Sequence, residues 1–180
     1  YYGYGRGYYS RWTQGVKSLL IACGTTFLVQ YVAGRAFTEL FGLVPWYVTH
    51  RFFLWQLFTY MFLHGDFFHL LFNMFVLWMF GPELENLWGT REFLKYYFIT
   101  GMGAGALSVL VSANSFIPTV GASGAIYGLL LAFGLLFPDR YIYLYFFIPI
   151  KAKYLVIIFG AIEFLAAFSA QHIRYSVQSH

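Results

Sequence analysis

The sequence has few charged residues and a single cysteine. Only 10% of its 180 residues are charged, whereas 60% are hydrophobic and 24% are aromatic. A water-soluble domain of this length could not bury so much apolar surface, because folded proteins still expose a large share of their area. The composition therefore excludes an ordinary soluble domain and predicts a protein whose solvent is lipid.

The sparse charges and the lone thiol also exclude two kinds of partner. Lys and Arg exceed Asp and Glu by 11 to 7, yet the basic residues are scattered between apolar segments and form no patch for nucleic acid. Cys23 stands alone inside an apolar run, so it supports neither a disulfide framework nor a metal motif. We therefore predict no nucleic-acid partner, no disulfide framework and no metal motif at the cysteine.

Apolar stretches predict the fold class, an all-α membrane protein. Five stretches are candidate spans, although several fall short of the roughly 20 residues that an untilted span needs. They cover about 17–37, 67–81, 93–111, 120–137 and 152–170. The chain is thus expected to be an integral, multi-pass helical bundle. Its domains are predicted to be a flexible cytoplasmic tail at 1–16, a transmembrane domain at 17–170 and a C-terminal tail at 171–180.

The distribution of basic residues predicts the orientation. With a cytoplasmic N-terminus, eight Lys and Arg residues lie in inner segments and three in outer ones. This bias follows the positive-inside rule. The short connections fit a bacterial inner membrane.

Three connecting segments carry predictions of their own. Residues 38–66 contain Trp and Tyr and are expected to form an amphipathic hairpin in the outer interface. GPELENLWG, at 81–89, is expected to break the second span. Residues 141–153 are expected to run along the inner interface. Within the spans, Gly101 with Gly105, and Gly124 with Gly128, form small-residue stripes that predict close helix packing.

Polar side chains at membrane depth are costly and indicate function. HGDFFHLLFN, at the start of the second span, contains His69 and Asn73, which share a helix face at a spacing of four. Ser123 begins the fourth span, and Tyr127 follows four residues later. Because the second and fourth spans run in the same direction, we expect His69, Asn73 and Ser123 at one depth near the outer face.

This combination predicts acyl-transfer chemistry. A serine needs a base to become a nucleophile, and the oxyanion that it generates needs preorganised donors such as imidazole, amide or backbone N–H groups. Gly121 and Gly124 beside Ser123 would let a substrate backbone approach. Taken alone, a serine in a glycine-rich membrane helix is usually explained by packing, and a histidine at the start of a helix is more often a hydrogen-bonded structural residue. The G-x-S-x-G motif of soluble hydrolases is not matched, because Ala125 replaces its last glycine.

Taken together, His64, His69 and Asn73 followed by GASGAIYG at 121–128 resemble the rhomboid intramembrane serine proteases. The resemblance extends from about residue 17 and includes the WQLFTYMFLH lead-in and the GPELE turn. It implies a bundle of six spans that cleaves transmembrane segments of other proteins near the outer face of the bilayer, without metal or cofactor.

The resemblance also implies roles for individual residues. Ser123 would be the nucleophile, and His69 and Asn73 would be the oxyanion donors, joined by the N–H of Ser123. His64 would be structural and would hold the hairpin by hydrogen bonds. Tyr127 would pack against the catalytic imidazole.

The chain departs from the rhomboid pattern at the general base. The family places this histidine on a sixth span, in a context like A-H-x-x-G-x-x-x-G, whereas AIEFLAAFSA is followed here only by QHIRYSVQSH. His172 is a candidate by depth alone, since no predicted helix would hold its ring.

Three alternatives follow from this departure. The sequence after about residue 170 is truncated or frameshifted, the protein is an inactive rhomboid-like binder of transmembrane helices, or it is active with an unusual base. Loss of one member of a catalytic unit costs orders of magnitude in rate. The 180-residue chain is therefore predicted to be inactive or nearly so. The sequence predicts neither the substrate nor the oligomeric state.

Overall fold

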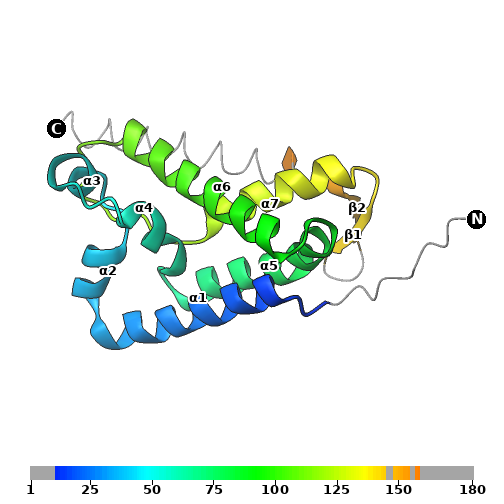
Figure 1. The fold of residues 1–180 in the computed structure, drawn as a ribbon, viewed down its shortest axis with the longest axis horizontal. Coiled ribbons are helices and arrows are strands. Elements are labelled where there is room, and N and C mark those ends of the chain that lie inside the picture. The colour runs from blue at the N-terminus through cyan, green and yellow to red at the C-terminus, as the bar shows by residue number, and fades with distance from the viewer. Residues whose placement is uncertain (1–10, 145–147, 155–156, 159–180) are drawn as a thin grey trace, which may run out of the picture. The chain divides into compact units, whose positions relative to one another are not determined.

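The computed structural model describes residues 11–144, 148–154 and 157–158, which are mostly helical (Figure 1). The helices are α1 (Gln14–Ala33), α2 (Arg35–Phe41), α3 (Pro45–Arg51), α4 (Gln56–Thr59), the 3₁₀ helix η1 (Tyr60–Phe62), α5 (Phe67–Trp88), α6 (Thr90–Val111) and α7 (Ser123–Leu136). The strands are β1 (Tyr141–Leu144) and β2 (Ile148–Lys151). The chain divides after Leu129 into two compact units, which are described separately.

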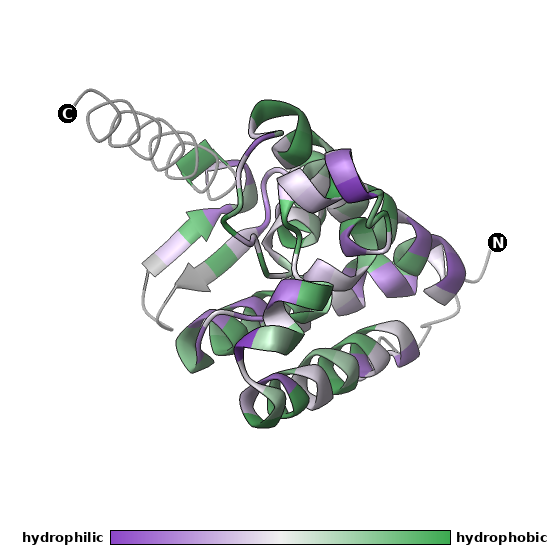
Figure 2. Ribbon diagram, turned by 90° about the vertical axis from the view of Figure 1, so that its left-hand side faces the viewer, coloured by the Kyte–Doolittle hydropathy of each residue, from purple (hydrophilic) through white to green (hydrophobic). Residues whose placement is uncertain are grey.

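Three of the described helices are long and apolar enough to cross a membrane. They are α1, α5 and α6, and α7 is a shorter apolar helix. Figure 2 shows many hydrophobic residues along the helices, and large apolar side chains such as Val32 and Leu110 are 87% and 79% exposed. Such side chains suit lipid as a solvent. These helices overlap in sequence with the first four predicted stretches, and the number of spans stays a prediction. Most of the fifth stretch, 152–170, lies outside the described residues, as do 1–10 and 171–180.

In the first unit, α1 and α5 lie side by side (Figure 1). A methyl group on Gly81 would lie only 2.7 Å from Cγ2 of Val16, so the two helices approach closely at this point. The Glu85 carboxylate accepts the backbone N–H groups of Gly15 and Val16 at 2.7 and 2.9 Å. Because these N–H groups lack partners within α1, Glu85 caps the beginning of that helix.

The predicted break at 81–89 is wrong. The helix α5 continues through Pro82 as far as Trp88, and Gly89, with φ of 81°, ends it. A proline inside a membrane helix is tolerated when neighbouring groups compensate for the lost hydrogen bond. Here Leu84 and Glu85 are buried beyond the proline. The capping bonds of Glu85 to α1 hold the final turns in helical form.

The small-residue stripes do pack closely. A methyl group on Gly124 would lie 2.5 Å from Cβ of Ala104, and one on Gly128 would lie 2.7 Å from Cβ of Thr100. The beginning of α7 therefore lies directly against α6, as predicted. A methyl group on Gly105 would lie 2.9 Å from the Tyr60 ring, so η1 also packs closely against α6.

The segment between α1 and α5 consists of four short helices, α2, α3, α4 and η1. Gln56 is fully buried at its centre. Its side chain accepts the N–H of Val44 at 3.0 Å and donates to the carbonyl groups of Glu39 and Leu40 at 3.0 and 3.1 Å. This one amide therefore joins α2, α3 and α4. The location of the segment in the outer interface stays a prediction.

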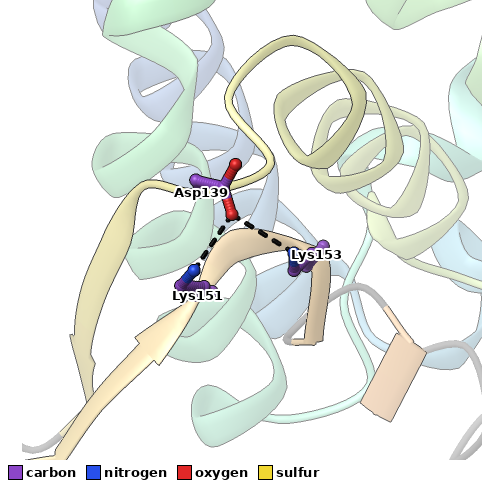
Figure 3. Close-up of polar contacts among 3 residues, drawn as sticks. All are labelled: Asp139, Lys151 and Lys153. Carbon is purple, nitrogen blue, oxygen red and sulfur yellow. Dashed lines mark hydrogen bonds and ion pairs between the residues drawn. The ribbon is translucent and has the colours of Figure 1, made fainter.

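The second unit contains a departure from the all-α prediction. The strands β1 and β2 pair antiparallel, with Tyr141 opposite Lys151 and Ile142 opposite Ile150. Alternating aromatic and β-branched residues favour strands over an interfacial helix. Beside it, Asp139 accepts hydrogen bonds from Lys151 at 3.1 Å and Lys153 at 3.2 Å (Figure 3). These contacts lower the pKa of the Asp139 carboxyl.

Candidate active site

Ser123 is the first residue of α7, where it follows a tightly held loop. Leu43 and Thr119 exchange backbone hydrogen bonds of 2.9 and 2.8 Å, and the N–H of Gly121 donates to the carbonyl of Tyr60 at 2.9 Å. The short helices between α1 and α5 thus fix the backbone just before Ser123. The side chain of Ser123 is half-buried, and its N–H belongs to the first turn, which has no acceptor within the helix.

Contacts with α3 hold the earlier part of the same loop, at residues 113–116. The backbone N–H of Trp46 donates to the carbonyl of Ser115 at 3.1 Å, and the Trp46 ring stacks on Phe116 with centroids 4.9 Å apart. The Thr49 hydroxyl lies 3.1 Å from the carbonyl of Ala113. The helix α3 therefore holds the loop that leads to Ser123.

His69 and Asn73 occupy the first two turns of α5. Asp66 caps this helix, and its carboxylate accepts the N–H of His69 at 2.9 Å. The N–H of Gly65 donates to Nδ1 of the His69 ring at 3.4 Å. A ring nitrogen that accepts a hydrogen bond carries no proton, so this contact favours the tautomer with hydrogen on Nε2. Nε2 of His69 is therefore assigned as a donor.

Asn73 lies one turn after His69 and is buried, with 3% of its surface exposed. Its Nδ2 atom has no hydrogen-bond partner among the described residues. A buried amide hydrogen without an acceptor is unfavourable. It is also a donor that an incoming oxygen could use.

His69 and Ser123 border the same point in space, although they come from different helices. A methyl group on Gly121 would lie 2.8 Å from Nε2 of His69 and 3.8 Å from Oγ of Ser123. Gly121 has φ of +126°, in the region that favours glycine. The absence of a side chain at this position therefore lets the imidazole donor and the serine hydroxyl approach one another.

The other predicted site residues have different surroundings. His64 is fully buried, and its ring packs edge-on against His69 with centroids 5.2 Å apart. Burial, together with the charge of His69, lowers the pKa of the His64 imidazole from 6.5 to about 4. Gly124 packs against α6, as described above. Tyr127 is half-buried one turn after Ser123. His172 lies outside the described residues, so its distance from Ser123 is not defined.

Comparison with known proteins decides the family. The model of the rhomboid domain matches residues 51–180, which is more than half of the chain. The chain belongs to the rhomboid family. The matched residues include His64, His69, Asn73 and Ser123, and the prediction drawn from their pattern is confirmed at the level of the family.

Several curated relatives of this rhomboid share between a third and a half of its residues in the aligned region. RHOMBOID-like protein 5 of Arabidopsis thaliana is 40% identical over 76 residues, 42% of this chain and 25% of the relative. Rhomboid protein 1, mitochondrial, of Saccharomyces cerevisiae is 36% identical over 90 residues, which are 48% of this chain and 26% of the relative. Putative rhomboid protease YdcA of Bacillus subtilis is 41% identical over 75 residues, which are 42% of this chain and 37% of the relative. The chain thus aligns with less than two fifths of each relative's length.

The sequence analysis overlooked two residues that hold the backbone of this rhomboid site. Gln30 in α1 holds the backbone of His64, and Tyr60 accepts the N–H of Gly121. Gln30 carried a readable signal, because a glutamine inside an apolar span is a polar group at membrane depth, as His69 is. Tyr60 carried none, since it acts through its backbone carbonyl.

Proposed function

We propose that this rhomboid is an intramembrane serine endopeptidase that cleaves transmembrane segments of other proteins. Ser123 is the nucleophile, and His69, Asn73 and the N–H of Ser123 are the oxyanion donors. The observation that carries the proposal is the common point at Gly121, bordered at 2.8 Å by Nε2 of His69 and at 3.8 Å by Oγ of Ser123. A nucleophile and a donor that converge on one point are the minimal arrangement for acyl transfer.

In the proposed reaction, Oγ of Ser123 attacks the carbonyl carbon of the scissile peptide bond. The carbonyl oxygen becomes an oxyanion and accepts hydrogen bonds from Nε2 of His69 and Nδ2 of Asn73. The C–N bond then breaks, the amine leaves with a proton from the base, and an ester on Ser123 remains. Water cleaves this ester and restores the hydroxyl.

The serine proton needs a general base. The described part of the chain contains three histidines, of which His69 serves as a donor. His50 stacks on Trp46 with centroids 4.9 Å apart. His64, with its pKa lowered to about 4, is a weak base at neutral pH. We therefore propose that the base comes from outside the described residues, where His172 is the candidate offered by the sequence.

The orientation and setting belong to the same proposal. The N-terminus is cytoplasmic by the positive-inside rule. In this orientation the inner side carries the basic residues near the start of α1, at the start of α6 and after α7, which are Lys17, Arg91, Lys95, Lys151 and Lys153. The site near the beginnings of α5 and α7 would face the outer side. The proposed compartment is a bacterial inner membrane, and Tyr127 would pack against the catalytic imidazole.

Cleavage of a single-span model substrate by the full chain in proteoliposomes tests the proposal. Cleavage or strong fluorophosphonate labelling that depends on Ser123 would also overturn the prediction that the 180-residue chain is inactive or nearly so. Ser123→Ala should abolish cleavage and should also abolish labelling by a fluorophosphonate probe. Ser108→Ala, which removes another half-buried serine hydroxyl, should leave both unchanged. His69→Ala and Asn73→Ala should each lower the rate by about 10²- to 10³-fold.

The alternative function is that of an inactive rhomboid-like protein that binds transmembrane helices. It predicts retention of the model substrate without cleavage, and no labelling that depends on Ser123. That pair of results would replace the protease proposal, because a folded nucleophile with its donors and its base reacts with the probe even when substrate access is restricted.

A further inference from the structure

Gln30 makes an unusually complete set of contacts with one residue of the site. It lies in the last turn of α1, and its side chain is half-buried. Nε2 of Gln30 donates to the carbonyl of His64 at 2.9 Å, and Oε1 accepts the N–H of His64 at 3.1 Å. The amide thus satisfies both polar groups of a single backbone position, as a neighbouring strand would.

The second hydrogen of the Gln30 amide is also used. Nε2 lies 3.2 Å from the hydroxyl oxygen of Thr38 in α2, to which it donates. The two contacts with His64 fix which end of the amide is nitrogen, because a carbonyl only accepts and a backbone N–H only donates. A carboxylate at position 30 could accept that N–H but could not donate to the carbonyl. A purely apolar side chain could do neither.

The peptide held by Gln30 leads directly to the His69 ring. The next residue, Gly65, donates its N–H to Nδ1 of His69 at 3.4 Å. Asp66 then caps the backbone of His69 at 2.9 Å. Both groups that set the position and tautomer of this imidazole therefore lie within two residues of His64. A shift of the turn would move the Gly65 N–H and release the ring.

We propose that Gln30 is a positioning residue, which sets the His69 imidazole through the turn at 64–66. The proposal rests on the proposed function, in which Nε2 of His69 donates to the oxyanion. Under this proposal α1 contributes to the reaction through Gln30, in addition to packing against α5. Gln30 itself touches no reacting atom.

The test measures how the full chain reacts with a fluorophosphonate, with the rate constant and the final extent of labelling at Ser123 recorded separately. Gln30→Met removes all three hydrogen bonds at nearly constant volume, and Gln30→Glu keeps only the acceptor for the N–H of His64. Gln14→Met is the matched control, because Gln14 is exposed on the same helix. Thr38→Val removes the third contact alone.

Gln30→Met should lower the maximal labelling rate roughly 10- to 100-fold, because small misplacements of catalytic groups have effects of this size. The apparent affinity for the probe and the final extent should stay near those of Gln14→Met. Gln30→Glu should fall between the two, and Thr38→Val should lower the rate less than Gln30→Glu does. An unchanged rate constant for Gln30→Met would overturn the proposal. So would a lower final extent of labelling with no change in the rate constant, because loss of a merely structural residue reduces only the fraction of protein that is folded.

A second readout separates this proposal from the proposed function. In protein with ¹⁵N-labelled histidine, the His69 ring, identified by its loss in His69→Gln, should show hydrogen on Nε2. Gln30→Met should convert it to a mixture of tautomers, whereas Gln14→Met should not. If Ser123 of the wild type does not react at all, the protease proposal fails. The ring signals then decide on Gln30 alone, and unchanged signals in Gln30→Met reject it.

Discussion

Gly121 and His69 are in direct contact, since a methyl group on Gly121 would lie 2.7 Å from Cε1 of the His69 ring. The distance is shorter than carbon atoms tolerate, so a side chain here must displace the imidazole. The glycine also has φ of +126°, which other residues rarely adopt. Two independent constraints therefore require glycine two residues before Ser123.

Gly121→Ala should lower the rate of fluorophosphonate labelling by about 100-fold, because the displaced His69 ring no longer reaches the oxyanion. The control is Gly103→Ala, since a methyl group on Gly103 would meet no heavy atom within 4 Å among the described residues. Equal labelling rates for the two variants would show that the imidazole is not a donor.

The sequence identifies the individual polar residues of the site because lipid makes them conspicuous. His69, Asn73 and Ser123 stand out in apolar helices, and the direction of the spans predicts their common depth. The sequence does not reveal which groups hold them. The contacts of Gln30 with His64, and of Trp46 with Ser115, join residues that are far apart in the chain. No spacing rule reports such pairs.

The errors of the sequence analysis have a related cause. Pro82 was expected to end a helix because local propensity disfavours proline, but the tertiary bonds of Glu85 with α1 hold the helix beyond it. The strands β1 and β2 were missed because the prediction rested on the apolar character of this segment and not on its alternating aromatic and β-branched residues, which favour strands. In both places, tertiary or cross-strand contacts decide the outcome.

The stack of Phe116 on Trp46 gives a prediction about the loop before Ser123. Phe116→Ala should loosen residues 112–120, seen as faster amide hydrogen exchange there, because an aromatic pair contributes about 0.5–1.5 kcal/mol beyond its buried area. Ile117→Ala is a close control, since Phe116 is 61% and Ile117 62% exposed and, of these two residues, Phe116 is the one that stacks on Trp46. Exchange that rises equally in both variants would mean that the ring stack does not hold the loop.

Glu85 should be important for stability and not for chemistry. Glu85→Gln removes one acceptor and the negative charge from the beginning of α1, where Gly15 and Val16 donate. The expected loss is about 1–3 kcal/mol, measured by equilibrium unfolding in a bilayer mimetic. Glu92→Gln breaks an exposed pair with Lys95 at 3.4 Å and should cost about 0.5 kcal/mol or less. A loss no larger than that of Glu92→Gln would show that the capping bonds contribute little.

The buried His64 ring predicts how stability depends on pH. Burial, with the neighbouring charge of His69, lowers the pKa of the His64 imidazole from 6.5 to about 4 in the folded protein. Below pH 6.5 the unfolded chain binds a proton at this residue that the folded chain does not. Stability is therefore fully present above pH 6.5, declines as the pH falls from 6.5 to 4, and declines no further on account of His64 below that.

Thermal unfolding of the purified protein between pH 7.5 and 4 should show this decline. His64→Gln should flatten the part of the curve between pH 6.5 and 4, because glutamine does not titrate. His50→Gln, which changes an exposed histidine on α3, should leave the slope as it is in the wild type. If the curve of His64→Gln were as steep as that of the wild type, the pH dependence would arise from other groups, and His64 would not be held neutral by its burial.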